Sequence, residues 1–162
     1  MSHIAIKMPA FHGKLPAHGD FISRGLDTPS LNSIDIWLSD IMARARKIWG
    51  ELFSSNYRMA QPWLFSGKKA VAVLMPSLDK VGRLFPLLTM ASPGTLLQQL
   101  YDLVHKAIAE SWVCDKLDSE LGKLETAHAN DQVQGWFLPQ SDHLALPHPM
   151  EGITPKIGGL LG

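Results

Sequence analysis

Residues 63–75 of the chain read WLFSGKKAVAVLM, and this stretch predicts a β-hairpin. Trp63 to Phe65 and Ala70 to Met75 are the two short strands, and Ser66-Gly67 is typical of the turn between them. Because every residue from Ala70 to Met75 is apolar, we expect this second strand to be buried on both faces.

Further strand patterns lie outward from the hairpin on both sides. His3 to Met8 alternates as a strand does, and prolines and glycines then interrupt regular structure through about Gly25. Leu84 to Ala91 is also typical of a strand, in which Pro86 requires an edge, an end or a bulge. Val133 to Leu138 predicts the last strand.

Helical spacing separates these strands. Apolar residues recur at steps of three and four from Ser30 to Phe53, and Ser30 or Asn32 is the expected cap. The same spacing predicts a second helix from about Thr95 to Val113 and a more polar third helix from about Asp115 to Thr126.

This order of strands and helices predicts an α/β (α+β) sandwich, a largely antiparallel sheet covered by helices. We expect residues 1–138 to form one domain and residues 139–162, rich in Pro, His and Gly, to form an irregular carboxyl-terminal tail. A chain of 162 residues, 46% of them hydrophobic, is long enough to bury a sizeable core.

Charge and targeting signals narrow the function classes. Fifteen basic and fifteen acidic residues cancel, so no long-range field gathers nucleic acid or an anionic membrane surface. The amino terminus lacks an export signal, and no apolar run approaches the roughly 20 residues of a membrane-spanning helix. Cys114 is the only cysteine, which suits a reducing compartment. We therefore expect a cytoplasmic protein without membrane insertion.

Two blocks of sequence carry a family resemblance. Residues 11–26 read FHGKLPAHGDFISRGL, and residues 74–87 read LMPSLDKVGRLFPL. Both resemble signatures of the TagF family, the second being similar to Met-Pro-Ser-x-Asp-x-Val-Gly-Arg-x-Phe-Pro. Asp35-x-Trp37-Leu38 resembles a weaker helical element of that family. The likeness fades past Thr126, where Gly135-Trp136-Phe137 is similar to a tryptophan-bearing strand near the family's carboxyl end.

The resemblance implies a regulator of bacterial type VI secretion with a fold similar to longin or roadblock sandwiches. It implies post-translational repression of the apparatus through binding of a cytoplasmic forkhead-associated scaffold protein. Such a role needs binding rather than turnover, so no cofactor and no metal are expected.

The two blocks also supply the candidate site residues. They are Lys14, Pro16, Gly19, Asp20, Phe21 and Arg24 in the first block, and Pro76, Ser77, Asp79, Gly82 and Arg83 in the second. Our hypothesis is that the two loops lie side by side, where Asp20 or Asp79 pairs with Arg83 or Arg24 and orders one composite surface. The alternative is that these polar residues only fasten the loops to the core, with Phe21 and Phe85 as anchors.

Other functions remain open at this stage. A hydrolase or metal-dependent enzyme would use His18, Asp20, Ser77 and Asp79, although Ser77 lacks the Gly-x-Ser-x-Gly elbow and the histidines lack a recognised metal spacing. Gly13-Lys14 does not match a phosphate-binding loop. A structural assembly module would instead form a homo-oligomer through an exposed sheet edge or helix.

Overall fold

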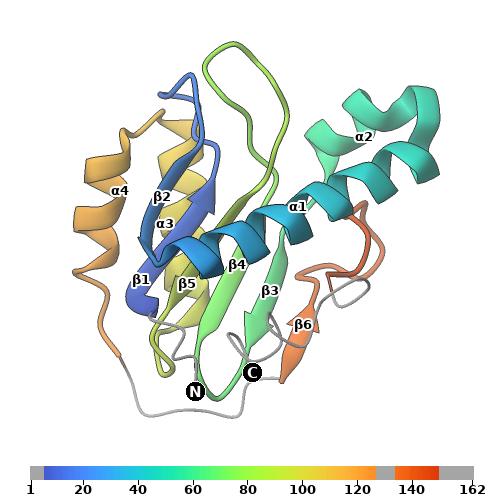
Figure 1. The fold of residues 1–162 in the computed structure, drawn as a ribbon. Helices are drawn as coiled ribbons and strands as arrows, with labels where there is room; N and C mark the ends of the chain where they lie inside the picture. The colour runs from blue at the N-terminus through green and yellow to red at the C-terminus, as the bar shows by residue number, and fades with distance from the viewer. Residues whose placement is uncertain (1–5, 127–133, 150–162) are drawn as a thin grey trace.

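The computed structural model describes residues 6–126 and 134–149. The strands of the described residues are β1 (Ile6–Gly13), β2 (Ile22–Leu26), β3 (Trp63–Ser66), β4 (Val71–Met75), β5 (Leu87–Ala91) and β6 (Gly135–Phe137). The helices are α1 (Thr28–Trp49), a 3-10 turn (Gly50–Leu52), α2 (Phe53–Met59), α3 (Leu97–Ala109) and α4 (Cys114–Leu121). The strands form one sheet in the order β2-β1-β5-β4-β3-β6, and every neighbouring pair is antiparallel (Figure 1).

Helices cover both faces of this sheet, which confirms the predicted α+β sandwich. The long helix α1 crosses one face, and α3 and α4 pack on the other (Figure 1). Strand β4 shows why, because Ala72 and Leu74 point to the α1 side while Val71 and Val73 point to the α3 side. All five residues of β4 are buried, as their apolar run predicts.

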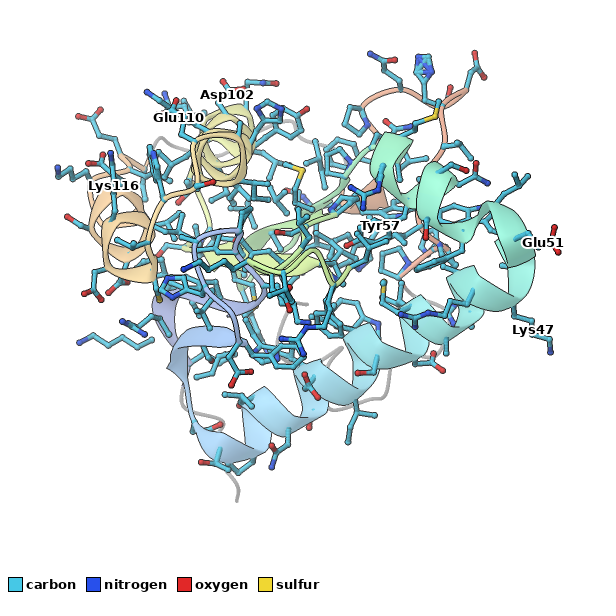
Figure 2. The ribbon with its side chains drawn as sticks, turned by 90° about the horizontal axis from the view of Figure 1, so that it is seen from above. Lys47, Glu51, Tyr57, Asp102, Glu110 and Lys116 are labelled. Atoms are coloured by element: carbon cyan, nitrogen blue, oxygen red, sulfur yellow. The ribbon has the colours of Figure 1, made fainter. Side chains whose placement is uncertain are left out.

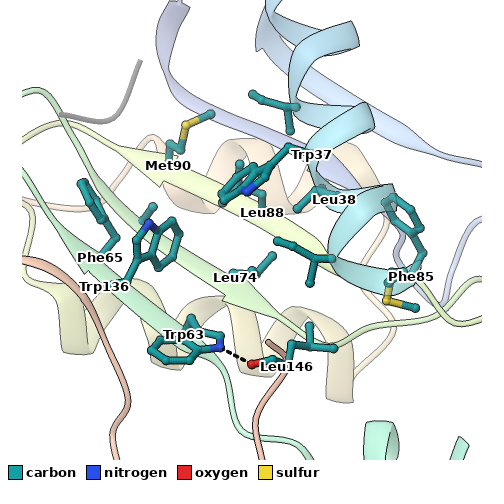
Figure 3. Packing of buried hydrophobic residues seen from close by; sticks show 14 of the residues in the cluster. Trp37, Leu38, Trp63, Phe65, Leu74, Phe85, Leu88, Met90, Trp136 and Leu146 are labelled. Carbon is teal, nitrogen blue, oxygen red and sulfur yellow. Dashed lines mark hydrogen bonds between the residues drawn. The ribbon is translucent and has the colours of Figure 1, made fainter. Parts of the chain in front are cut away.

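The core on the α1 side centres on aromatic residues. Trp37 of α1 lies over Leu88 and Met90 of the sheet, and Trp136 of β6 packs against Phe65 of β3 (Figure 3). The amphipathic spacing of the helix therefore places its apolar stripe where the sequence predicts it.

The first strand differs from the expectation that it ends at Met8. It continues to Gly13, because the register with β2 shifts between Ile6 and Phe11 and the shift accommodates Pro9. The segment through Gly25, expected to be irregular, also contains most of β2. The expectation was wrong since a proline at a register irregularity does not end a strand.

The first helix begins earlier and ends sooner than its apolar spacing indicates. Asp27, rather than Ser30 or Asn32, is the cap, and its side chain accepts a hydrogen bond from Ser30 N at 2.8 Å. The helix ends at Gly50, which has a φ of +54°, and the chain turns into α2. Glycine reaches this positive φ without the strain that a side chain adds.

The later elements are shorter than predicted but lie in the predicted places. β5 starts directly after Pro86, so the proline stands at a strand end, one of the places expected for it. α3 stops before Ser111, whose φ is +53°, and α4 stops at Leu121. β6 confirms the last strand over Gly135–Phe137, while Val133 lies outside the described residues.

Residues 138–149 follow β6 and pack onto the core. Leu146 is buried, and its carbonyl oxygen accepts a hydrogen bond from Trp63 Nε1 at 2.8 Å (Figure 3). Trp37 Nε1 donates to Pro149 O at 2.8 Å in the same way. None of the helices in the described ranges combines the length and apolar character that crossing a membrane requires.

Candidate functional site

The two motif loops leave the same end of the sheet. The first loop, residues 14–21, joins β1 to β2, and the second, residues 76–86, joins β4 to β5. Because β1 and β4 both run antiparallel to β5, their ends lie at the start of β5. Gly13 allows a close approach there, since a Cβ built on it would lie 2.1 Å from Pro86 O. The topology therefore brings the two sequence blocks side by side, at the top of Figure 1.

Hydrogen bonds fasten the two loops to each other. Ser77 Oγ donates to Lys14 O at 2.7 Å, Lys80 N donates to His18 O at 2.8 Å, and Arg83 Nη2 donates to Gly19 O at 2.8 Å. Each bond joins a residue of one block to a residue of the other, across more than sixty positions of sequence. The hypothesis that the loops lie together holds in the structure.

Asp79 is the centre of this junction. Its Oδ2 accepts hydrogen bonds from Lys14 Nζ at 2.9 Å and from Arg83 Nε at 2.7 Å. Its Oδ1 accepts from the backbone N–H groups of Val81 and Arg83, both at 3.0 Å. The carboxylate is thus held between a cation of the first loop and a cation of its own loop.

The environment of Asp79 favours its charged form. The residue is only 1% exposed, and burial alone raises a carboxyl pKa. The hydrogen bonds from Lys14, from the Arg83 backbone and from the Arg83 guanidinium outweigh burial and hold the pKa of Asp79 well below its usual range. Asp79 is therefore ionised at neutral pH and hydrogen-bonded through both of its carboxylate oxygens.

The outward side of the joined loops is exposed. We call Asp20, Phe21, Lys80, Val81 and Arg83 the loop patch, because all five are exposed residues of these two loops. Val81 is 71% exposed and Phe21 45% exposed, so two apolar side chains stand among three charged ones.

Phe21 is both exposed and held in place. Its ring stacks on the ring of His12, with centroids 5.7 Å apart, and meets Phe85 edge-on at 5.0 Å. Lys14 Nζ lies 4.8 Å from the centre of the same ring. Phe85 is buried, as expected of an anchor, whereas Phe21 is anchored on one side and open to solvent on the other.

Some candidate residues have partners other than those predicted. Asp20 Oδ1 accepts from Phe21 N at 2.7 Å instead of pairing with an arginine. Arg24 pairs with Asp115 of α4 at 2.7 Å, which joins β2 to that helix and not to the second loop. Gly82, with a φ of +90°, forms the turn in which its N–H donates to Asp79 O at 3.0 Å. Pro16 and Pro76 are half-buried near the starts of the two loops.

A histidine that was not among the candidate partner residues also lies here. His12 Nε2 and Asp35 Oδ1 are 2.9 Å apart, so the weaker helical motif contributes its aspartate beside the loops. His12 Nδ1 is buried without a hydrogen-bond partner among the described residues. The alternation of β1 places His12 on the α1 side with Ala10. A predicted strand that ends at Met8 does not reach His12, so the strand pattern could not assign His12 to a face of the sheet.

The same contacts bear on the enzymatic alternatives. Ser77 is buried and its hydroxyl donates to a backbone carbonyl, which leaves it without the exposed, base-activated position of a nucleophile. His18 Nε2 accepts from Cys114 N at 2.8 Å. Burial raises the pKa of the Cys114 thiol and favours its protonated form. Over residues 6–126 and 134–149, no group of three His, Cys, Asp or Glu side chains is arranged to hold a metal.

Comparison with known proteins gives a family and a structural neighbour. A family model described as TagF N-terminal domain, Type VI secretion system-associated, matches residues 10–134. The chain is also similar to the crystal structure of PA0076 from Pseudomonas aeruginosa PAO1, with a TM-score of 0.62 and 25% sequence identity. The match covers 72% of this chain and 62% of PA0076, so this chain spans less than two thirds of that protein. No curated protein matches the sequence.

Proposed function

This chain belongs to the TagF family of type VI secretion-associated proteins, and from that premise we propose that it is a non-catalytic repressor of type VI secretion. In this proposal it acts in the cytoplasm, after the apparatus has been made, by binding a forkhead-associated scaffold protein. One observation carries the proposal beyond family membership. The two sequence blocks that resemble the family signatures build a single braced surface around Asp79.

The loop patch has the composition of a small protein-binding surface. Aromatic residues and arginine are enriched in protein interfaces, and exposed apolar side chains give contact area at the centre of a charged rim. Phe21 and Val81 supply such area, while Asp20, Lys80 and Arg83 supply charges that select the partner.

The bracing favours binding by a preformed surface. Arg83 is held at both Asp79 and Gly19, and Phe21 is held by His12 and Phe85. A surface that is ordered before the partner arrives loses less conformational entropy on binding. Polar groups that are engaged with one another in this way support a binding role better than a catalytic one.

The test is a secretion assay in the native bacterium. Deleting the gene is expected to raise the amount of type VI substrate in the culture medium, and returning the wild-type gene to lower it. Val81→Asp is expected to fail to restore repression, because it adds a charge to an exposed apolar contact while the backbone N–H that donates to Asp79 is retained.

Ile48→Asp is the matched control, since Ile48 is 68% exposed and lies near the end of α1, outside both loops. It should repress as the wild type does. Unchanged secretion after deletion of the gene would overturn the repressor role. Equal repression by the Val81 and Ile48 variants would show that the loop patch is not the binding surface.

A second assay addresses the partner. Purified protein and the forkhead-associated scaffold should form a complex in calorimetry, and Asp20→Lys should weaken it. Asp20 is exposed, and among the described residues its side chain is hydrogen-bonded to the neighbouring Phe21 N–H alone, so the charge reversal leaves the Asp79 network intact. Absence of any complex with the wild-type chain would reject this partner while leaving repression through another protein open to the secretion assay.

A further inference from the structure

A cavity lies beside the second motif loop and is separate from the loop patch. It has a volume of about 360 Å³ and is bounded by α2, by the start of the loop after β4, and by α3. Pro76 and Ser77 of the motif form part of its wall, and Tyr57 of α2 forms another part. The residues that line it do not include any member of the loop patch.

The polar side chains on the inner wall of this cavity, Tyr57 and Ser77, are already hydrogen-bonded. Tyr57 Oη donates to Ser77 O at 2.8 Å and accepts from Ser77 N at 2.9 Å. Ser77 Oγ donates a hydrogen bond to Lys14 O. Met75, Leu84 and Ile108 complete an apolar lining, so an occupant gains most from an apolar group.

The charged residue at the opening of the cavity is basic. Arg58 of α2 and His105 of α3 both line the cavity and are exposed, and none of its lining residues is acidic. Within the described ranges Arg58 forms no ion pair. Asp102 of α3 accepts from Gln98 at 2.9 Å, and Glu110, directly after α3, accepts from Trp112 Nε1 at 3.4 Å; neither residue lines the cavity.

We propose that this cavity is a docking site for a segment of a partner protein that carries an apolar side chain next to carboxylates. The apolar side chain fills the space between α2 and α3, and a flanking carboxylate lies at Arg58 and His105. The volume is at the low end of the roughly 300–1,000 Å³ of ligand pockets, which suits one or two side chains better than a long acyl chain. The proposal does not depend on repression, since it concerns binding at a different surface.

The test is a titration of the isotope-labelled full chain, followed by amide chemical shifts. The probe is the blocked peptide Ac-Glu-Leu-Leu-Glu-amide, and the comparison peptide is Ac-Lys-Leu-Leu-Lys-amide. The acidic peptide should shift the amides of Tyr57, Ser77 and Ile108, and the basic peptide should leave them unchanged at the same concentrations. Equal shifts with both peptides, or none with either, would overturn the proposal.

Two variants at the cavity and one control variant show where the peptide binds. Arg58→Glu should weaken binding of the acidic peptide about tenfold, because a rim charge then repels the carboxylates. Lys47→Glu makes the same charge change on α1 at the outer end of the molecule and should bind as the wild type does (Figure 2). Ala109→Trp, at an exposed lining residue, should fill the cavity and abolish binding in a protein whose circular dichroism is unchanged.

Other occupants give different results. Shifts of the same amides with decanoate but not with the acidic peptide would assign the cavity to an acyl carboxylate and reject the peptide. Shifts that grow with protein concentration alone would assign it to a second copy of the chain, which also rejects the proposal. Acidic-peptide binding that survives both Arg58→Glu and Ala109→Trp would place the peptide elsewhere.

Discussion

Asp79 joins two distant parts of the chain, because its hydrogen-bond partner Lys14 lies 65 positions earlier in the sequence. A buried carboxylate is costly unless other groups solvate it, and here two cations and two backbone N–H groups replace water. Removal of Asp79 would leave the buried Lys14 without its counter-charge, and removal of Lys14 would leave the buried carboxylate with Arg83 as its one remaining cation. The position of the loop patch therefore depends on the ionised form of one side chain.

This dependence predicts how stability changes with pH. The pKa of Asp79 is lower in the folded protein than the roughly 3.9 of an unfolded aspartate, so ionisation stabilises the fold above about pH 4. The stabilisation is lost as the pH falls below that value toward the folded pKa. We expect the urea midpoint of the wild type to fall between about pH 5 and pH 2.5, and to fall less steeply in Asp79→Asn.

Glu51→Gln is the control, because Glu51 is exposed in the 3-10 turn and far from the loops in sequence. Its pH profile should parallel that of the wild type. If Asp79→Asn is too unstable to measure, Lys14→Gln should flatten the profile through loss of the same ion pair. Parallel profiles for the wild type and both loop variants would show that the network contributes no pH-dependent stability.

Only some of the side-chain contacts in and around the two motif blocks could be predicted from the residues. The pairing of Asp79 with Arg83 is a local contact within one motif, so the block itself indicates it. Arg24 pairs with Asp115, 91 positions away, and no spacing or periodicity connects those two residues. Side-chain partners across such separations depend on strand order, which the sequence pattern does not encode directly.

The sequence predicts a helix or strand well where the pattern of apolar residues follows directly from which faces of the element are buried. A stripe of apolar residues in α1 and a continuous apolar run in β4 arise because the sheet is covered on both faces. Element ends depend instead on single residues. Asp27 and Gly50 set the ends of α1. Asp27 lies before the predicted apolar stripe and Gly50 lies within it, and neither residue changes the period of the stripe.

The helix start gives a direct test of this distinction. Asp27→Ala is expected to lower the free energy of unfolding by about 0.5–2 kcal/mol, because the Ser30 N–H loses its side-chain acceptor. Asn32→Ala, at one of the caps expected from sequence, lies inside the helix and should change it by less than about 0.5 kcal/mol. Urea denaturation at neutral pH measures both, and a larger loss in Asn32→Ala would contradict the observed cap.

At the scale of the whole molecule, the strand order explains why the site exists. A hairpin pattern predicts that β3 pairs with β4, but nothing in the pattern predicts that β1 inserts beside β5. That insertion brings residues 14–21 against residues 76–86. The antiparallel class was predictable from short strands and tight turns, whereas the neighbours of β1 were set by long-range packing.

The segment after β6 provides the last prediction. Sequence periodicity is absent there, yet Leu146 is 2% exposed and its backbone accepts the bond from Trp63, so its packing comes from tertiary contacts alone. Leu146→Ala should therefore lower the free energy of unfolding by about 2–4 kcal/mol and shift tryptophan emission to the red as water reaches Trp63. Leu144→Ala, the same change at a side chain that is 37% exposed, should cost less than about 1 kcal/mol. Similar small losses in both variants would mean that residues 138–149 lie on the core without stabilising it.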